Sequence, residues 1–444
     1  MEILYLIVAV LFIVLLTTQL KVHPFLALLI ISIAYGLFAG MPLLEITLAI
    51  NEGFGGTLGK IGLIIVLGVI IGAFLENTGG AQTIAMKVLA LIGKKRIPLA
   101  MGAIGYIVSI PVFADSGFML LHPLNKGLSK KAGISLAGAA IALGLGLMAS
   151  HTMVPPTPGP IAAAGILKAN LGLVIAFGIP VSLIALAAGV LFASKYASRT
   201  YIDPEKGDTS AAEMKTETAE APGIMRSSLP ILIPIFLIVL KSVLGVQAKG
   251  EMSRIYEVIN FVGEPVIALL IGVFLCLLLP KRLNKDMLSS TGWVGKAIKD
   301  AASILLITGA GGIFGTVLQM SGIADLLGNA LQDLNIGIFL PFILAAALKT
   351  AQGSSTVALV TTASIIAPMM PSLGYDSEIQ KALVVVAIGS GSAMVSHAND
   401  SFFWVVTQMS GMNVKTGYRL FGLGTSVLGI TGAMAVFIIS LLFA

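Results

Sequence analysis

The sequence predicts an all-α polytopic membrane protein, with about ten full transmembrane helices and two re-entrant hairpins in two inverted repeats. Hydrophobic residues make up 57% of the 444 residues and charged residues only 11%, whereas a soluble domain carries roughly 25% charged residues. The charges lie in short islands between apolar runs, and several runs reach the roughly 20 residues that cross a bilayer. The net charge of +6 is then the excess of basic cytoplasmic loops and does not indicate nucleic acid.

Ten segments are predicted to be full crossings. They cover residues 3–20, 24–40, 60–76, 134–158, 171–194, 228–246, 257–280, 301–319, 381–400 and 421–443. The first lacks a basic n-region and a small-residue cleavage site, so we expect it to be retained. Two further apolar stretches, residues 98–124 and 338–371, are interrupted by polar and small residues, and each is predicted to enter and leave on one side. Because irregular backbone at membrane depth must be buried or line a wet cavity, each break points to a site.

The two halves resemble each other at an offset of about 240 residues, an internal symmetry found in transporters. Residues 75–79 match 318–322, residues 114–117 match 352–355, and residues 149–151 match 395–397. Each half holds five crossings, an odd number, so the second half enters the membrane from the opposite side. The predicted domains are a first repeat over residues 1–197, a flexible cytoplasmic linker over 198–226, and a second repeat over 227–444.

Lysine and arginine are distributed unevenly between the predicted loops. With the N-terminus outside, the inner loops hold clusters such as residues 94–96, 126–131 and 281–285. The outer side keeps only scattered residues such as Lys60, Lys168, Lys249, Arg254 and Lys381. This asymmetry predicts that both termini lie outside, that the first hairpin opens from the cytoplasm, and that the second opens from outside.

The first hairpin tip holds Asp115, Ser116 and Gly117. A carboxylate at membrane depth is costly unless it faces water or a partner. Asp115 is therefore a candidate proton acceptor or hydrogen-bond partner for substrate hydroxyls. The alternative is a helix cap for the returning half-helix, and the two roles are compatible.

The second hairpin tip holds Gly353, Ser354, Ser355 and Thr356. Gly353 allows the backbone to turn, and the three hydroxyl residues then open a new half-helix. The positive end of that helix dipole suits a carboxylate. The alternative is that the hydroxyls only satisfy the turn.

Two histidines lie beside predicted breaks. His151 precedes four prolines within residues 155–160, so its span must unwind and leave backbone groups for a ligand. In the matching segment, His397 and Asp400 are three residues apart and share a face if the segment is helical. A histidine beside a carboxylate can relay protons near neutral pH. The alternative is that each histidine only hydrogen-bonds to a neighbouring helix.

Other polar residues are given structural positions. Glu76 and Asn77 end a span and are either an interfacial cap or part of coupling, while His23 and His122 are placed at the membrane interface. Cys276, the single cysteine, is expected to be a small core- or lipid-facing residue, so no disulfide is possible.

These motifs resemble the gluconate permease family, within the ion transporter superfamily. The resemblance rests on residues 115–118, on His151 with residues 155–160, on residues 351–358 and on residues 396–404, and it covers nearly the whole chain. It implies proton-coupled symport of gluconate or a related small hydroxylated carboxylate across the bacterial inner membrane. It also implies a homodimer with scaffold and mobile, elevator-type transport domains. No cofactor and no metal are expected.

The residues predicted to carry function fall into two groups. Those expected to bind substrate are Asp115, Ser116, Gly117, His151, Thr157, Gly353, Ser354, Ser355, Thr356 and Asn399. Those expected to carry protons are Asp115, His397 and Asp400.

The sequence departs from the gluconate pattern at two places. Thr157 stands where histidine is common between the prolines, and Asp115-Ser116 stands where Glu-Val or Asp-Val is more usual. Gluconate, another sugar acid, glycerate, 3-hydroxybutyrate and D-serine therefore all stay open as substrates.

Other functions remain as alternatives. A sodium-coupled carboxylate transporter fits the broken spans, which could supply carbonyl ligands. A cation/proton antiporter is disfavoured by the scarcity of intramembrane carboxylates. A channel would need a continuous pore lined by rings of charge or carbonyls. A membrane enzyme is disfavoured because the chain has no H-E-x-x-H, no nucleophile elbow and no cysteine cluster.

Overall fold

The computed structural model describes residues 2–93, 96–204, 221–247, 254–322 and 337–443, and within these ranges every regular element is a helix. The first half contains α1 (Glu2–Thr18), α2 (Pro24–Phe38), α3 (Leu43–Asn77), α4 (Gly80–Ile92), α5 (Ile97–Val108), α6 (Ala114–Ala132), α7 (Leu136–Met153), α8 (Pro158–Ile166), α9 (Leu171–Lys195) and η1 (Ala197–Arg199). The second half contains α10 (Ile224–Gln247), α11 (Arg254–Val262), α12 (Pro265–Cys276), α13 (Lys285–Leu288), α14 (Trp293–Met320), α16 (Phe339–Gln352), α17 (Ser355–Ile366), η2 (Ala367–Met369), α18 (Glu378–Ser392), α19 (Ser401–Met409), α20 (Val414–Gly417), η3 (Tyr418–Gly422) and α21 (Leu423–Ser440).

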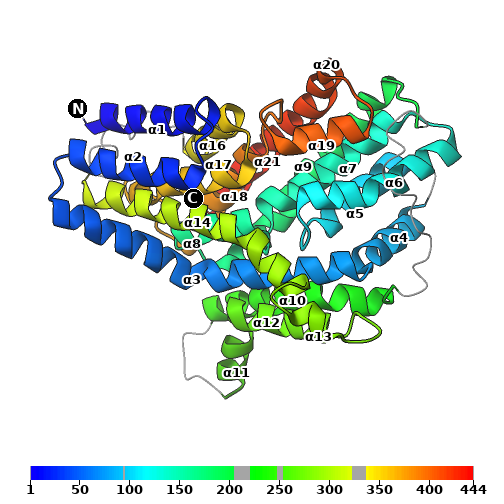
Figure 1. Ribbon diagram of the computed structural model, residues 1–444, viewed down its shortest axis with the longest axis horizontal. Helices are drawn as coiled ribbons and strands as arrows, with labels where there is room; N and C mark the ends of the chain where they lie inside the picture. Colours follow the sequence, from blue (N-terminus) through cyan, green and yellow to red (C-terminus); the bar gives the residue numbers. More distant parts are fainter. Residues whose placement is uncertain (1, 94–95, 205–220, 248–253, 323–336, 444) are drawn as a thin grey trace.

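The helices form two groups (Figure 1). On one side, α1, α2, α14 and α3 lie next to one another, with α10 to α13 beyond α3. On the other side, α5, α6, α7, α9 and α19 pack together. Six helical segments of the described chain are long and apolar enough to cross a membrane, and shorter apolar helices accompany them. The chain is therefore a multi-pass membrane protein, and the number of ten crossings stays a prediction.

The long helix α3 differs from the span predicted at residues 60–76, because it begins much earlier, at Leu43. Its polar, glycine-rich first half packs against α14. A Cβ atom added to Gly53 would lie 2.6 Å from the carbonyl oxygen of Gly312. The two helices can approach this closely only with glycine there, which is how small residues bring membrane helices together. This packing keeps the segment helical despite its polar side chains.

Two other predicted spans are shorter than expected. The span at residues 257–280 is divided into two helices. α11 ends at Val262 and α12 begins at Pro265, so Gly263 lies in the break between them. The span at residues 381–400 ends as α18 at Ser392. The eight residues that follow up to Asp400 leave the helix, and their side chains and backbone bind other elements, as described below.

One detail of the predicted repeat reappears in the geometry. Both α3 and α14 end at a glycine with positive φ, +75° at Gly79 and +77° at Gly322. These glycines occupy the same place in the matched segments 75–79 and 318–322. Left-handed glycine is a common helix ending, so this agreement decides nothing, and the repeat and its domain boundaries stay predictions. Of the linker at 198–226, residues 205–220 lie outside the described ranges.

The two predicted hairpins are both present as helix–break–helix units. α5 and α6 are separated by residues 109–113, and α16 and α17 by Gly353 and Ser354. The proline-rich break after His151 is also present, because α7 ends at Met153 and α8 begins at Pro158. The re-entrant placement of the hairpins in the bilayer stays a prediction.

Candidate functional site

The tips of the two hairpins line one cavity. Its volume is about 240 Å³. It is lined by Ala114, Asp115, Met148, His151, Gln352, Gly353, Ser354, Ser355, Thr356, Asn399, Asp400, Ser401 and Phe402. These residues come from the start of α6, the end of α7, the α16–α17 tip and the start of α19. Segments far apart in the sequence therefore meet at one polar space.

Three helices begin at this cavity, and each presents its positive end to it. In α17, Ser354 caps the helix by accepting a hydrogen bond from the Val357 amide at 3.3 Å. The Ser355 and Thr356 amides belong to the first turn, so they have no acceptor within the helix. α6 and α19 begin at the same cavity. Helix N-termini arranged in this way favour an anion such as a carboxylate.

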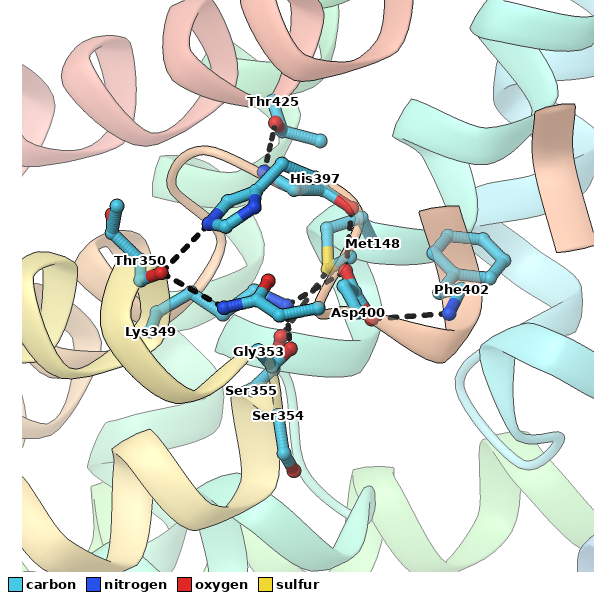
Figure 2. A network of polar contacts seen from close by, with 12 residues as sticks. Met148, Lys349, Thr350, Gly353, Ser354, Ser355, His397, Asp400, Phe402 and Thr425 are labelled. Atoms are coloured by element: carbon cyan, nitrogen blue, oxygen red, sulfur yellow. Dashed lines mark hydrogen bonds and ion pairs between the residues drawn. The ribbon is translucent and has the colours of Figure 1, made fainter. Parts of the chain in front are cut away.

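A buried ion pair lies beside the second tip (Figure 2). The Lys349 ammonium donates to Asp400 Oδ2 at 2.7 Å and also to the Gly353 carbonyl. The side chains of Lys349 and Asp400 are only 1% and 6% exposed. Ser396 Oγ donates to the same carboxylate oxygen, and the Phe402 amide donates to Asp400 Oδ1 at 3.0 Å. Asp400 is thus fully engaged and also caps α19.

Lys349 was not among the residues predicted from the sequence. It lies in the last turn of α16, within an apolar stretch, only four residues before Gly353. A lysine inside a membrane segment is rare and marks a functional position by default. This signal is visible in the sequence, because Lys349 is a charged residue in an otherwise apolar helix.

Asp115 and His151 are the other ionisable side chains on the cavity wall. Asp115 Oδ1 and His151 Nδ1 are buried and form no hydrogen bond within the described part of the chain. The charges of Lys349 and Asp400 act on both groups. The four side chains therefore form one electrostatically coupled cluster, in which a change of charge at one position alters the energy of the others.

Residues 393–400 fasten the second tip in place. His397 Nε2 donates to the Thr350 carbonyl at 2.7 Å. Asn399 Nδ2 donates to the same carbonyl at 2.9 Å and to the Ala351 carbonyl at 3.0 Å. These bonds satisfy carbonyl groups at the end of α16, which have no partner within the helix. Figure 2 shows the His397 side chain directed at Thr350 in this helix end.

The predicted site residues separate into two sets. The cavity wall contains Asp115, His151, Gly353, Ser354, Ser355, Thr356, Asn399 and Asp400. Ser116, Gly117, Thr157 and His397 do not line it. Thr157 instead precedes α8 at its N-cap position without capping it through the side chain, and its hydroxyl donates to the Val154 carbonyl at 2.6 Å. His397 acts on the tip from outside the cavity. The functional roles of both sets stay predictions.

The burial of His122 is not visible in the sequence. It is only 3% exposed and its ring stacks on Phe118 with 5.4 Å between the ring centroids. The cause is the packing of α5, α7 and α19 against α6, and its position at the membrane interface stays a prediction. His23, given the same interfacial position, is exposed. Among the described residues, no group of three or more His, Cys, Asp or Glu is placed to hold a metal ion.

Comparisons with known proteins agree with this architecture. Residues 1–442 match the family described as GntP family permease. The chain is 33% identical to the gluconate permease of Pseudomonas aeruginosa, covering 98% of this chain and 96% of that relative. It is also 33% identical to the D-serine transporter of Escherichia coli, covering 98% and 97%.

A solved structure shows a similar fold. The crystal structure of the YdaH transporter from Alcanivorax borkumensis, described as having an unusual topology, superposes with a TM-score of 0.63. The superposition covers 88% of this chain and 87% of that one, at 14% sequence identity. At this identity the likeness concerns the fold alone.

Proposed function

The chain belongs to the GntP permease family, and from this premise we propose that it imports gluconate or a related small hydroxylated carboxylate by proton symport across the bacterial inner membrane. As a permease it is a transporter and not an enzyme. The observation that carries the proposal is the cavity between the hairpin tips. Three helix N-termini meet there with the ionisable side chains of Asp115, His151 and Asp400, and Lys349 binds Asp400 from behind the wall.

The chemistry of the cavity suits a small anion with hydroxyl groups. The first-turn amides of α17 can bind a carboxylate. The side chains of Ser355, Thr356 and Ser401 supply donors and acceptors for hydroxyls. The volume of about 240 Å³ is below the range of roughly 300–1,000 Å³ that drug-sized ligands occupy. Gluconate and D-serine, after which two relatives are named, are small molecules of this size class.

The exact substrate depends on the residues of the cavity wall. The replacement of a common histidine by Thr157 is therefore a weaker argument for a shorter acid than the sequence indicates. Thr157 replaces the histidine that is common in the family, but it lies outside this cavity and its hydroxyl is bound to Val154. Asp115 does lie on the wall. An uptake competition with gluconate, glycerate, 3-hydroxybutyrate and D-serine, each added in excess, identifies the preferred substrate.

Proton coupling is favoured over sodium coupling by Lys349. Unwound carbonyls and helix C-terminal ends are where transporters hold sodium. Here the end of α16 holds an ammonium group instead, bound to the Gly353 carbonyl and the Asp400 carboxylate. A sodium ion would have to displace this fixed positive charge. Asp115 and His151 are left as cavity-facing groups that can gain or lose a proton.

The larger architecture belongs to the same proposal. Two inverted repeats, re-entrant hairpins, a homodimeric scaffold, a mobile transport domain and termini on the outer side follow from the repeat, the distribution of basic residues and the family. They explain how a site between two hairpin tips could be exposed alternately to the two sides of the membrane.

The test uses purified protein in proteoliposomes. A pH gradient with the outside acidic, in the absence of sodium, should drive protons inward. Radiolabelled substrate should then reach a higher concentration inside the vesicles than outside. An inward sodium gradient at equal pH and zero membrane potential should drive none. Accumulation by sodium alone would contradict proton coupling, and equilibration without accumulation under either gradient would indicate a channel.

A further inference from the structure

One face of α6 carries a row of polar side chains and one phenylalanine, of which only Asp115 belongs to the transport site. Asp115, Phe118, His122, Asn125 and Ser129 are three or four residues apart, so they lie on the same face of the helix. His122 is 3% exposed, and Asn125 and Ser129 are 0% exposed. The row begins at the cavity with Asp115 and runs toward the C-terminal end of α6.

The polar atoms of this row have no protein partners. Both ring nitrogens of His122, both amide atoms of Asn125 and the hydroxyl of Ser129 form no hydrogen bond within the described residues. The same holds for the buried hydroxyl of Ser410, which follows α19. The Met409 backbone lies near the His122 ring, but the two form no hydrogen bond of normal geometry. Each unsatisfied buried group costs about 1–3 kcal/mol, so such a concentration needs a partner other than protein.

A proline adds another polar group to the same region. Pro123 lies inside α6, and a proline within a helix frees the carbonyl four residues earlier, here Met119. The helix thus has additional hydrogen-bonding capacity beside His122. In an interface without water, this carbonyl group would remain without a hydrogen-bond donor.

The surroundings of the row contain little charge. The helices packed against α6 are α5, α7 and α19. They hold no Asp, Glu, Lys or Arg, and their titratable side chains are Tyr106 and His151. On α6 itself, Lys126 acts on His122. A metal cation would find no carboxylate beside Asn125 or Ser129, whereas water can bond to every group in the row.

An aromatic pair separates this row from the cavity. The Phe118 ring is fully buried, stacks on His122 and meets the Phe402 ring edge-on at 6.2 Å. Phe402 also lines the cavity, and its amide is bound to Asp400. Figure 2 shows Phe402 beside Asp400 at the start of α19. A change in the charge or position of Asp400 would therefore move one half of the aromatic pair.

We propose that the row His122, Asn125 and Ser129, with Ser410, is a hydrated proton pathway from the end of α6 to Asp115, closed by the Phe118–Phe402 pair. Asp115 and His122 are about 10.5 Å apart along the helix, at 1.5 Å per residue, so water must bridge them. A proton enters one ring nitrogen of His122 while the other nitrogen releases one to water. The last water of the chain then protonates the Asp115 carboxylate, and no electrons are transferred.

The hydration is tested without any assumption about transport. Cys276 is the single cysteine, so Cys276→Ala gives a background free of thiols. In that background, Asn125→Cys and Ser129→Cys should react with a small hydrophilic methanethiosulfonate, and Ala140→Cys in the apolar interior of α7 is the matched control. A dry thiol reacts only when the structure opens, so we expect the two α6 positions to react about tenfold faster or more.

Equal, slow reaction at all three positions would overturn the hydrated pathway. If the cysteine variants do not fold, hydroxyl-radical footprinting of the unmodified protein gives a second measurement. Modification at His122 above that of dry, buried Phe314 supports hydration, and none at His122 overturns it.

The role in proton movement rests on the proposed symport and has its own test. Asn125→Leu removes the polar atoms, and Asn125→Ser keeps a hydroxyl. We expect Asn125→Leu to lower the initial rate of pH-gradient-driven uptake about tenfold or more, with substrate counterflow unchanged and with Asn125→Ser near wild type. Unchanged uptake in Asn125→Leu would overturn the proton role. Failure of the wild-type protein to use a pH gradient would instead contradict the symport proposal and leave the labelling result valid.

Discussion

The Lys349 ammonium and the Asp400 carboxylate are 2.7 Å apart in the interior, where α16 ends and α19 begins. Separating them would leave two charges in a medium that solvates neither, which costs several kcal/mol per ion. The pair therefore keeps the second hairpin tip and the segment before α19 together. The tip can move relative to this segment only if one of the two charges is neutralised or forms a new ion pair with the substrate.

Removing the lysine alone should be more damaging than removing both charges. Lys349→Met leaves Asp400 buried and uncompensated, which should destabilise the protein by about 3–5 kcal/mol. Lys349→Met combined with Asp400→Asn should recover much of the thermal stability measured in detergent. Lys381→Met is the control, because its pair with Glu378 at 3.0 Å is partly exposed and such pairs contribute at most about 1 kcal/mol. A Lys349→Met protein as stable as wild type would show that the ion pair does not hold the tip.

Asp115→Asn tests whether the carboxylate carries the proton. The amide has nearly the same shape as the carboxyl group but does not take up a proton near neutral pH. The variant should therefore bind substrate and catalyse counterflow, but it should fail to concentrate substrate under a pH gradient. Equilibrium binding and proteoliposome uptake provide the two measurements. Asp286→Asn, at the exposed start of α13, should behave as wild type. Normal accumulation by Asp115→Asn would assign the proton to another group.

Gly353→Ala tests the close approach at the second tip. Gly353 has a φ of +91°, and a Cβ atom there would lie 2.2 Å from the Asn399 carbonyl oxygen. The substitution should displace residue 399 and remove most transport. Gly374→Ala is the matched control, since Gly374 has a φ of +74° with open space around its Cβ position. It should cost only the left-handed backbone strain of about 1–2 kcal/mol and leave transport intact. Equal effects in the two variants would show that strain alone explains the loss.

The sequence predicted the membrane class, both hairpins and the break after His151 because each leaves a local pattern. Apolar length defines spans, and prolines end helices wherever they occur. The tips at Asp115 and Gly353 were found for the same reason, since a polar residue in an apolar run is visible without any structure. Eight of the candidate residues selected in this way lie on one cavity.

The features that sequence reasoning missed depend on which helices meet. The polar start of α3 is helical because Gly53 packs on Gly312, a contact between residues far apart in the chain. His122 is buried because other helices cover its face of α6. Lys349 is conspicuous in its apolar segment, but its ion-pair partner, Asp400, follows 51 residues later. Neither local propensity nor hydrophobic period contains such long-range contacts.

Ser354→Ala should separate the role of the second tip in binding from its role in folding. Ser354 caps α17 by accepting from the Val357 amide at 3.3 Å, and loss of such a cap costs about 1 kcal/mol. Ser377 caps α18 in the same way, through the Gln380 amide at 3.2 Å, but lies on the exposed surface. Both alanine variants should therefore lose similar thermal stability.

Only the first of these two caps borders the cavity. Loss of the Ser354 hydroxyl frees the first turn of α17 to shift away from the substrate carboxylate. We expect Ser354→Ala to weaken equilibrium binding about 2- to 10-fold, equivalent to one net hydrogen bond of about 0.5–1.5 kcal/mol, while Ser377→Ala leaves affinity unchanged. If both variants lost stability equally and neither lost affinity, the substrate carboxylate would not lie at the start of α17, and its place among the three helix N-termini would have to be α6 or α19.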